Sequence, residues 1–212
     1  MTVIYSHAPN AQVSQAYYQA LVDFLRQKTG ETSLNSPSPL QGPVEINQYL
    51  SLIKSANAQL SPDWGIELGL QFRPATYGIL GLLPLHCDNL LEALNMVLKF
   101  EGLVHDLGCS SVTMHQDKLV FNWQANFFDD DCLKPVAESV IAGMQQFSSW
   151  LSGRTIPVSF LALPAPCHHP WLKTLGIEPS VQAGKLEMHL NIQDLLIPIP
   201  QADSQIKQAL LT

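Results

Sequence analysis

The first part of the chain places hydrophobic residues at helical spacing. Residues 11–29 carry apolar side chains every three or four positions, which is the period of one helix face. Gly30 follows directly, and glycine commonly ends a helix at this position. Residues 44–60 repeat the pattern, whereas the proline-rich stretch 31–43 between them cannot stay helical. The pattern therefore predicts two amphipathic helices joined by a loop as a helical hairpin.

Residues 64–86 are apolar and are interrupted by glycines at short intervals, which favours short helices that pack closely through them. The glycines in question are Gly65, Gly69, Gly78 and Gly81. Asp88 or Asn89 is then expected to cap a longer helix with an apolar face between residues 90 and 104. A further helix is predicted over 129–151, with acidic residues at its start and Pro135 in its first turn.

Alternating apolar and polar residues predict strands in the second half of the chain. In residues 111–123 a two-residue loop at Gln116-Asp117 would pair Met114 with Leu119 and Val112 with Phe121, all on one buried face. Residues 156–163 predict a short buried strand. Residues 181–190 predict a second hairpin about Gly184-Lys185, with four side chains facing inward: Val181, Ala183, Leu186 and Met188.

The order of these elements predicts an α+β fold. N-terminal helices would pack with a mixed, largely antiparallel sheet built from two hairpins and a central strand, with helices between them. We expect one domain over residues 1–212, with a helical part at about 10–62 and an α+β part at about 63–205.

Composition narrows the function. The 18 acidic residues outnumber the 11 lysines and arginines, giving a net charge of −7, and the cations are scattered. Such a chain is a poor partner for nucleic acid, which needs clustered cations. The four cysteines have no CxxC spacing, and we find neither a signal peptide nor an apolar run of membrane-spanning length. These observations indicate a cytoplasmic protein with reduced thiols.

The stretch Cys167-His168-His169 carries ligand types that transition metals prefer. However, adjacent side chains point apart, and the three flanking prolines (Pro164, Pro166 and Pro170) stiffen the backbone, so converging ligands are not expected. We interpret the stretch as a surface turn and predict no metal site. The acidic run Asp129-Asp130-Asp131 fits the start of a helix better than a cation site.

Glu101 and His105 are the more informative polar pair. On a helical wheel Glu101 falls in the middle of the apolar face of the 90–104 helix, and His105 lies four residues further on. A carboxylate there is costly unless it is paired or faces a cavity. One hypothesis is that both line a ligand pocket and anchor a polar or cationic head group, beside the aromatic side chains of Phe72, Tyr77 and Trp123. The alternative is that Gly102 ends the helix, that Glu101 and His105 meet water, and that the aromatic residues are core.

Five short motifs along the chain are similar to those of one family. They are Leu68-Gly69-Leu70, Arg73-Pro74, Tyr77-Gly78, Leu80-Gly81 and Leu91-Glu92-Ala93-Leu94. Together with the C-terminal run from Leu195 to Asp203, they resemble the N-terminal effector domain of AraC-type transcription regulators, in the "arabinose-binding" branch. The resemblance covers roughly residues 12–210.

This resemblance implies a bacterial ligand-sensing domain that binds a small organic effector, forms a homodimer and needs no cofactor. A C-terminal helix-turn-helix domain is expected to contact DNA, and the helix after the last hairpin would pass the signal to it. The helices at 90–104 or 136–151 are candidate dimer surfaces. An alternative is a free-standing interaction or small-molecule-binding module. We expect no enzyme, because the sequence has no nucleophile, metal or phosphate-binding motif of a known type.

Overall fold

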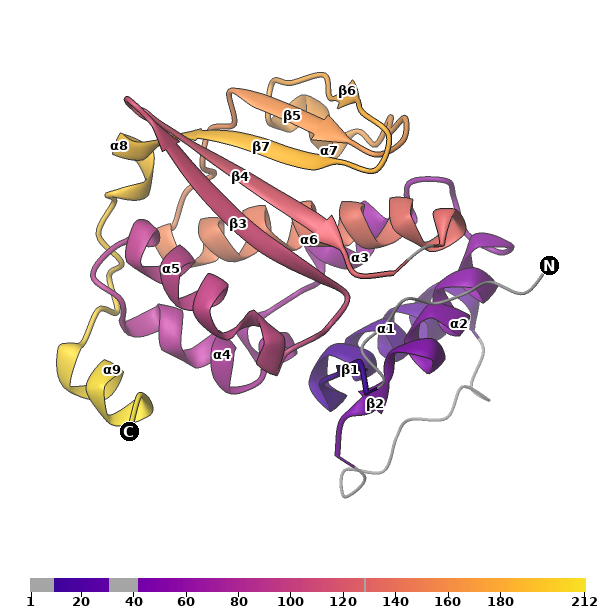
Figure 1. The fold of residues 1–212 in the computed structure, drawn as a ribbon, viewed down its shortest axis with the longest axis horizontal. Coiled ribbons are helices and arrows are strands. Elements are labelled where there is room, and N and C mark those ends of the chain that lie inside the picture. Colours follow the sequence, from indigo (N-terminus) through magenta and orange to yellow (C-terminus); the bar gives the residue numbers. More distant parts are fainter. Residues whose placement is uncertain (1–9, 31–41, 128) are drawn as a thin grey trace.

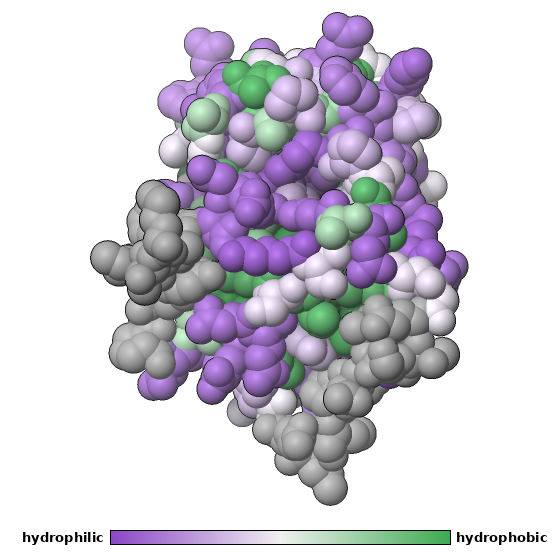
Figure 2. Space-filling view, turned by 90° about the vertical axis from the view of Figure 1, so that its right-hand side faces the viewer, coloured by the Kyte–Doolittle hydropathy of each residue, from purple (hydrophilic) through white to green (hydrophobic). Residues whose placement is uncertain are grey.

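A computed structural model describes residues 10–30, 42–127 and 129–212. Most of the predicted loop at 31–43 lies outside these described residues. Figure 1 shows the α+β architecture: a twisted sheet covers one side of a long central helix, and most helices from the first half of the chain lie on the other side of that helix. Within the described ranges, no helix is both long and apolar enough to cross a bilayer. The face shown in Figure 2 is largely hydrophilic, with hydrophobic residues visible in a band across its middle.

The main sheet has five strands in the order β3-β4-β7-β5-β6. Their bounds are Gly108–His115 (β3), Lys118–Ala125 (β4), Phe160–Leu163 (β5), Ser180–Val181 (β6) and Leu186–Asn191 (β7). Neighbouring strands are antiparallel except β5 and β6, which are parallel. The sheet is therefore mixed and largely antiparallel, as predicted, but its central strand is β7.

The predicted register of the first hairpin is confirmed. Met114 pairs with Leu119 and Val112 pairs with Phe121, around a turn in which Gln116 adopts a left-handed φ of 54°. The prediction that all four would be buried is wrong for β3. Leu119 and Phe121 on β4 are buried, but Val112 is half-buried and Met114 is exposed. Val112 and Met114 are less buried because β3 is an edge strand of the sheet.

The predicted second hairpin is wrong, because β5 lies between β6 and β7. Residues 182–185 do form a turn, in which the backbone N–H of Lys185 donates to the carbonyl of Gln182. The strand before that turn, β6, pairs in parallel with β5. The connection from β5 to β6 contains the helix α7 (Trp171–Thr174). Only the β7 half of the predicted inward face is buried: Leu186 and Met188 face the core, whereas Val181 and Ala183 are exposed.

Helix α6 (Asp130–Ser152) crosses the centre of the molecule beneath the sheet (Figure 1). It is buried on most sides and not along a single stripe. The prediction that Pro135 lies in the first turn is wrong, because the helix begins at Asp130 and Pro135 falls in its second turn. Proline has no N–H to donate to the carbonyl of Asp131 four residues earlier. The side-chain amide of Asn57 donates to that carbonyl instead, at 2.7 Å, so the missing helical hydrogen bond is replaced by a tertiary one.

Two glycines let α3 (Trp64–Leu70) lie unusually close to α6. A Cβ atom on Gly65 would come within 2.4 Å of the carbonyl oxygen of Pro135, and one on Gly69 within 2.5 Å of that of Ser139. Both distances are shorter than real Cβ contacts, so the two backbones touch. This confirms the prediction of close packing for Gly65 and Gly69, but the prediction is wrong for Gly78, where a Cβ atom would meet nothing within 4 Å.

The N-terminal helices form the predicted hairpin as α1 (Gln15–Thr29) and α2 (Ile46–Asn57). The hydroxyl of Ser14 caps α1, and Gly30 ends it in the left-handed conformation with φ 71°. Short strands before each helix, β1 (Gln12–Val13) and β2 (Val44–Glu45), pair with one another. They replace the first turns of the two predicted helices.

The remaining elements lie in residues 74–103 and 192–210. They are η1 (Pro74–Tyr77), α4 (Ile79–Leu82), η2 (Leu83–His86), α5 (Leu90–Phe100), η3 (Glu101–Leu103), α8 (Ile192–Leu195) and α9 (Ser204–Leu210). The side chain of Asn89 caps α5 by accepting from the backbone N–H of Glu92, as one of the two predicted caps.

We predict that Gly69→Ala lowers the free energy of unfolding by about 1–3 kcal/mol, the usual cost of overpacking a dense core. The added methyl would displace α3 from α6. Gly102→Ala is the control, because a Cβ atom there meets nothing within 4 Å. Urea unfolding of both variants measures the difference. Equal stability of the two would show that the close contact is dispensable.

Candidate functional site

Glu101 occupies the junction between a helix and a tight turn. Helix α5 ends at Phe100 and continues as the 3-10 turn η3, so the uninterrupted helix through Gly102 is not formed. The chain nevertheless stays against the core here, because β1 holds the following segment. The backbone N–H of Ser14 donates to the carbonyl of Val104 at 2.6 Å, and that of Asp106 donates to the carbonyl of Gln12 at 2.8 Å.

The carboxylate of Glu101 is half-buried and points toward strand β3. Its Oε1 accepts a hydrogen bond of 2.6 Å from the backbone N–H of Ser110. Burial raises the pKa of Glu101 above its usual 4.5, and the hydrogen bonds from Ser110 offset part of that increase. The side chain of Ser110 also hydrogen-bonds to this carboxylate. Glu101 is therefore held by Ser110 and has no lysine or arginine partner among the ion pairs of the described residues.

His105 packs edge-on against Tyr17, with ring centroids 4.9 Å apart. Its Nδ1 is enclosed and has no hydrogen-bond partner among the described residues. Burial lowers the pKa of His105 to about 4, so the ring is neutral at physiological pH. Within the described chain, no ion pair or hydrogen bond joins the side chains of Glu101 and His105. The two residues share a site without forming a direct pair.

A cavity of about 60 Å³ brings the predicted residues together. Glu101, His105, Phe72, Tyr77 and Trp123 all line it. It is large enough to hold water or a small polar group. The indole N–H of Trp123 is buried and, like His105 Nδ1, has no partner among the described residues. The two residues that carry these unpaired polar atoms thus line the same small space.

Glycines make room for the aromatic rings of this site. A Cβ atom on Gly143 of α6 would lie 2.7 Å from the ring of Phe72 and 2.8 Å from the hydroxyl oxygen of Tyr77. A Cβ atom on Gly108 of β3 would lie 2.3 Å from the ring of Trp123. These backbone positions fix where the rings can sit, so the site depends on close packing around it.

A second, apolar cavity of about 90 Å³ adjoins the first. The two share Tyr77, Leu80, Val97 and Met144 as lining residues. The second cavity lies between α5 and α6 and is otherwise lined mainly by aliphatic side chains and Phe147. The pair of cavities offers a polar end and an apolar end, which is typical of small-molecule sites.

Sequence reasoning missed several residues of this site. Ser110 contributes through its backbone N–H, which no sequence pattern reveals. Tyr17 belongs to a helix predicted only as core, and Met144 to the predicted stripe of the central helix. Nothing in the periodicity of these residues distinguishes a cavity wall from a filled core.

The Cys167-His168-His169 stretch was predicted to be a surface turn, and this is wrong for the side chain of Cys167. Cys167 is buried, whereas His168 is exposed. Ligand-type atoms of Asp63, Glu138 and Cys167 lie within 4.8 Å of one another, and neither histidine belongs to this group. The ammonium of Lys134 occupies the place that a metal ion would take beside these carboxylates. It pairs with Asp63 at 2.7 Å and with Glu138 at 2.5 Å.

Burial raises the pKa of Glu138 to about 7, partly offset by Lys134. The group is therefore explained as an ion-pair network that links α6 to the start of α3. The acidic run at the start of α6 also has a structural role, because the buried Asp129 pairs with Lys54 at 2.6 Å.

The family model for the "Arabinose-binding domain of AraC transcription regulator, N-term" matches residues 36–194, which is well over half of the chain. The chain belongs to this family. Its fold is similar to the crystal structure of the transcriptional regulator CdpR from Pseudomonas aeruginosa, with a TM-score of 0.69 and 18% sequence identity. That similarity covers 92% of this chain but 61% of the regulator. No curated protein matched.

Family membership assigns the chain to the ligand-binding domains of transcription regulators. Nearly all residues that line the two cavities lie inside the matched region, the exceptions being Tyr17 and Leu195.

We predict that acid destabilises the domain partly through His105. Its pKa is lower in the folded state, so the unfolded chain binds more protons between about pH 6.5 and pH 4. The resulting stability is full above pH 6.5 and is lost as the pH falls, by up to about 3 kcal/mol. Unfolding of wild type and His105→Gln across this range measures the contribution, which His105→Gln should remove. The exposed His115→Gln is the control, and equal pH slopes in all three proteins would contradict the prediction.

Proposed function

We propose that the chain is the effector-binding and dimerisation domain of an AraC-type regulator. A small organic effector would occupy the paired cavities and control an attached helix-turn-helix DNA-binding domain. One observation carries the proposal: His105 and Trp123, whose buried nitrogens lack partners in the described part of the chain, line a cavity that adjoins an apolar one. Leaving a buried polar atom unpaired costs about 1–3 kcal/mol, so a bound ligand that pairs with one of them is favoured.

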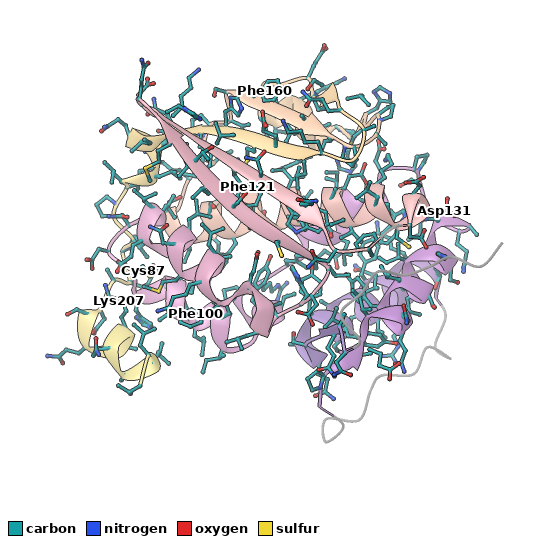
Figure 3. The ribbon with its side chains drawn as sticks, viewed as in Figure 1. Cys87, Phe100, Phe121, Asp131, Phe160 and Lys207 are labelled. Carbon is teal, nitrogen blue, oxygen red and sulfur yellow. The ribbon has the colours of Figure 1, made fainter. Side chains whose placement is uncertain are left out.

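The position of α5 supports transmission of a signal. Leu90, Ala93, Leu94 and Val97 of α5 line the apolar cavity. At the start of the same helix, Glu92 accepts hydrogen bonds of 2.8 and 3.1 Å from the ammonium of Lys207 on α9. Figure 3 shows Lys207 beside Cys87, in the segment that leads into α5. An effector that shifts α5 would therefore also shift α9.

Helix α9 depends on such polar contacts, because none of its residues is buried. Besides Glu92, Lys207 pairs with Asp88 at 3.6 Å, and the backbone N–H of Asp203 donates to the carbonyl of His86. A helix held in this way can change position at low cost. For a change to be transmitted, the effector must prefer one of the two arrangements.

Exposed apolar side chains around α5 support dimerisation. Leu103 ends η3, the turn that follows α5, and is 66% exposed. Ile79 and Leu82 on α4 are exposed as well. The other candidate surface, 136–151, is mostly buried within α6 because the sheet and α3 pack against it. The dimer proposal therefore rests on the surface around 90–104.

A thermal-shift screen of amino acids, amines, fatty acids and sugars tests effector binding, because a ligand selective for the folded state raises the melting temperature. For the ligand found, Trp123→Phe removes the buried N–H and should weaken binding about tenfold. Trp150→Phe is the matched control, since Trp150 is exposed and lines neither cavity. Full affinity in Trp123→Phe would place the ligand elsewhere.

Light scattering at high micromolar concentration tests dimerisation. We expect a dimer for the wild type, and a dissociation constant at least about tenfold higher for Leu103→Glu, because the change places a charge in an apolar contact. Met114→Glu is the control, as Met114 is similarly exposed but lies on the edge strand β3. A monomeric wild type would refute the dimer.

A further inference from the structure

The polar cavity combines one carboxylate with a wall of aromatic rings. Its aromatic lining comes from four separate elements, α1, β4, η1 and the segment before η1. These residues are Tyr17, Phe72, Tyr77, Phe121 and Trp123. We propose that the effector carries a positively charged nitrogen, an alkylammonium group, on a short apolar body. This inference rests on the proposed function, since it names the chemical class of ligand for the same cavities.

The charge of the lining selects the sign of the ligand. Glu101 is the one carboxylate among the lining residues of both cavities, and no lysine or arginine lines either of them in the described part of the chain. A buried charge is costly unless it is paired, so a positive charge beside the half-buried Glu101 is favoured. The carboxylate of Glu101 can accept from an ammonium, whereas it would repel an anionic ligand.

The aromatic residues strengthen the preference for a cation. Three of the rings lie close together: Tyr17 is 5.2 Å from Phe72 and 6.3 Å from Tyr77 between centroids. Aromatic faces attract ammonium groups, and the attraction grows to about 2 kcal/mol when water is excluded. His105, whose ring lies 4.9 Å from that of Tyr17, is neutral and adds no opposing charge.

The adjoining cavity selects the rest of the ligand. It is lined by hydrophobic side chains except for Ser148 and the hydroxyl of Tyr77. Val97 and Met144 stand between the two cavities, and methionine is a flexible side chain that can move to join them. A ligand with its nitrogen at Glu101 would extend its hydrocarbon part past Met144 toward Leu94 and Phe147.

Titration calorimetry of the purified chain at pH 7.5 with three probes of equal length tests the charge: hexylammonium, 1-hexanol and hexanoate. We expect hexylammonium to bind at least about tenfold more tightly than 1-hexanol, and hexanoate to bind most weakly. Glu101→Gln should remove most of this preference. The exposed Glu45→Gln, which changes the net charge equally, should keep it.

The pH dependence provides a second measurement. Ammonium binding needs ionised Glu101, whose pKa is raised, so hexylammonium affinity should fall between pH 7.5 and pH 5. The other titratable groups that line the cavity stay neutral over this range: the pKa of His105 is lowered to about 4, and those of Tyr17 and Tyr77 are raised above 10. The binding of 1-hexanol should not show this fall.

The inference is overturned if 1-hexanol or hexanoate binds as tightly as hexylammonium, if Glu101→Gln keeps the preference, or if hexylammonium does not bind. These failures differ from failure of the proposed function. A neutral or anionic probe whose binding is weakened by Trp123→Phe would leave the cavities as the effector site and remove only the positive charge. The wild-type comparison decides the matter even if Glu101→Gln does not fold.

Discussion

The backbone contact between α3 and α6 is the constraint on which the rest of the structure depends. Gly65 and Gly69 allow the two helices to touch, and α6 in turn supports the sheet above and the short helices below. Because α6 is buried on most sides, its place cannot shift without moving the whole core. The ion pairs of Lys134 and the amide of Asn57 fix the first turns of the same helix.

The cavities follow from this packing. Gly143 lets the rings of Phe72 and Tyr77 lie against α6, and Gly108 does the same for Trp123 on β3. Large rings held by close backbone contacts cannot collapse into the space beside α5, so that space persists. A rigid wall on the α6 side and a less buried helix on the α5 side suit a site that must respond to a ligand.

Much of the fold was predictable because it depends on local pattern. Helix limits at Gly30 and Asn89 follow from capping chemistry, and the register of the β3-β4 hairpin follows from side-chain alternation. The second hairpin was not predictable, since alternation in 181–190 is the same whether the two segments pair with each other or with β5. Which partner a strand chooses is decided by contacts distant in sequence.

The sequence by itself determined most of the longer helices, the β3-β4 hairpin, the acidic balance and the unusual place of Glu101 beside an apolar helix face, because each depends on neighbours within a few residues. Only the tertiary structure decided that Glu101, His105 and Trp123 border one cavity, and that the cavity continues into an apolar one. It also decided that Cys167 is buried beside Glu138 and apart from the histidines. These facts depend on how helices and strands meet, and a one-dimensional pattern carries no record of distances across the core.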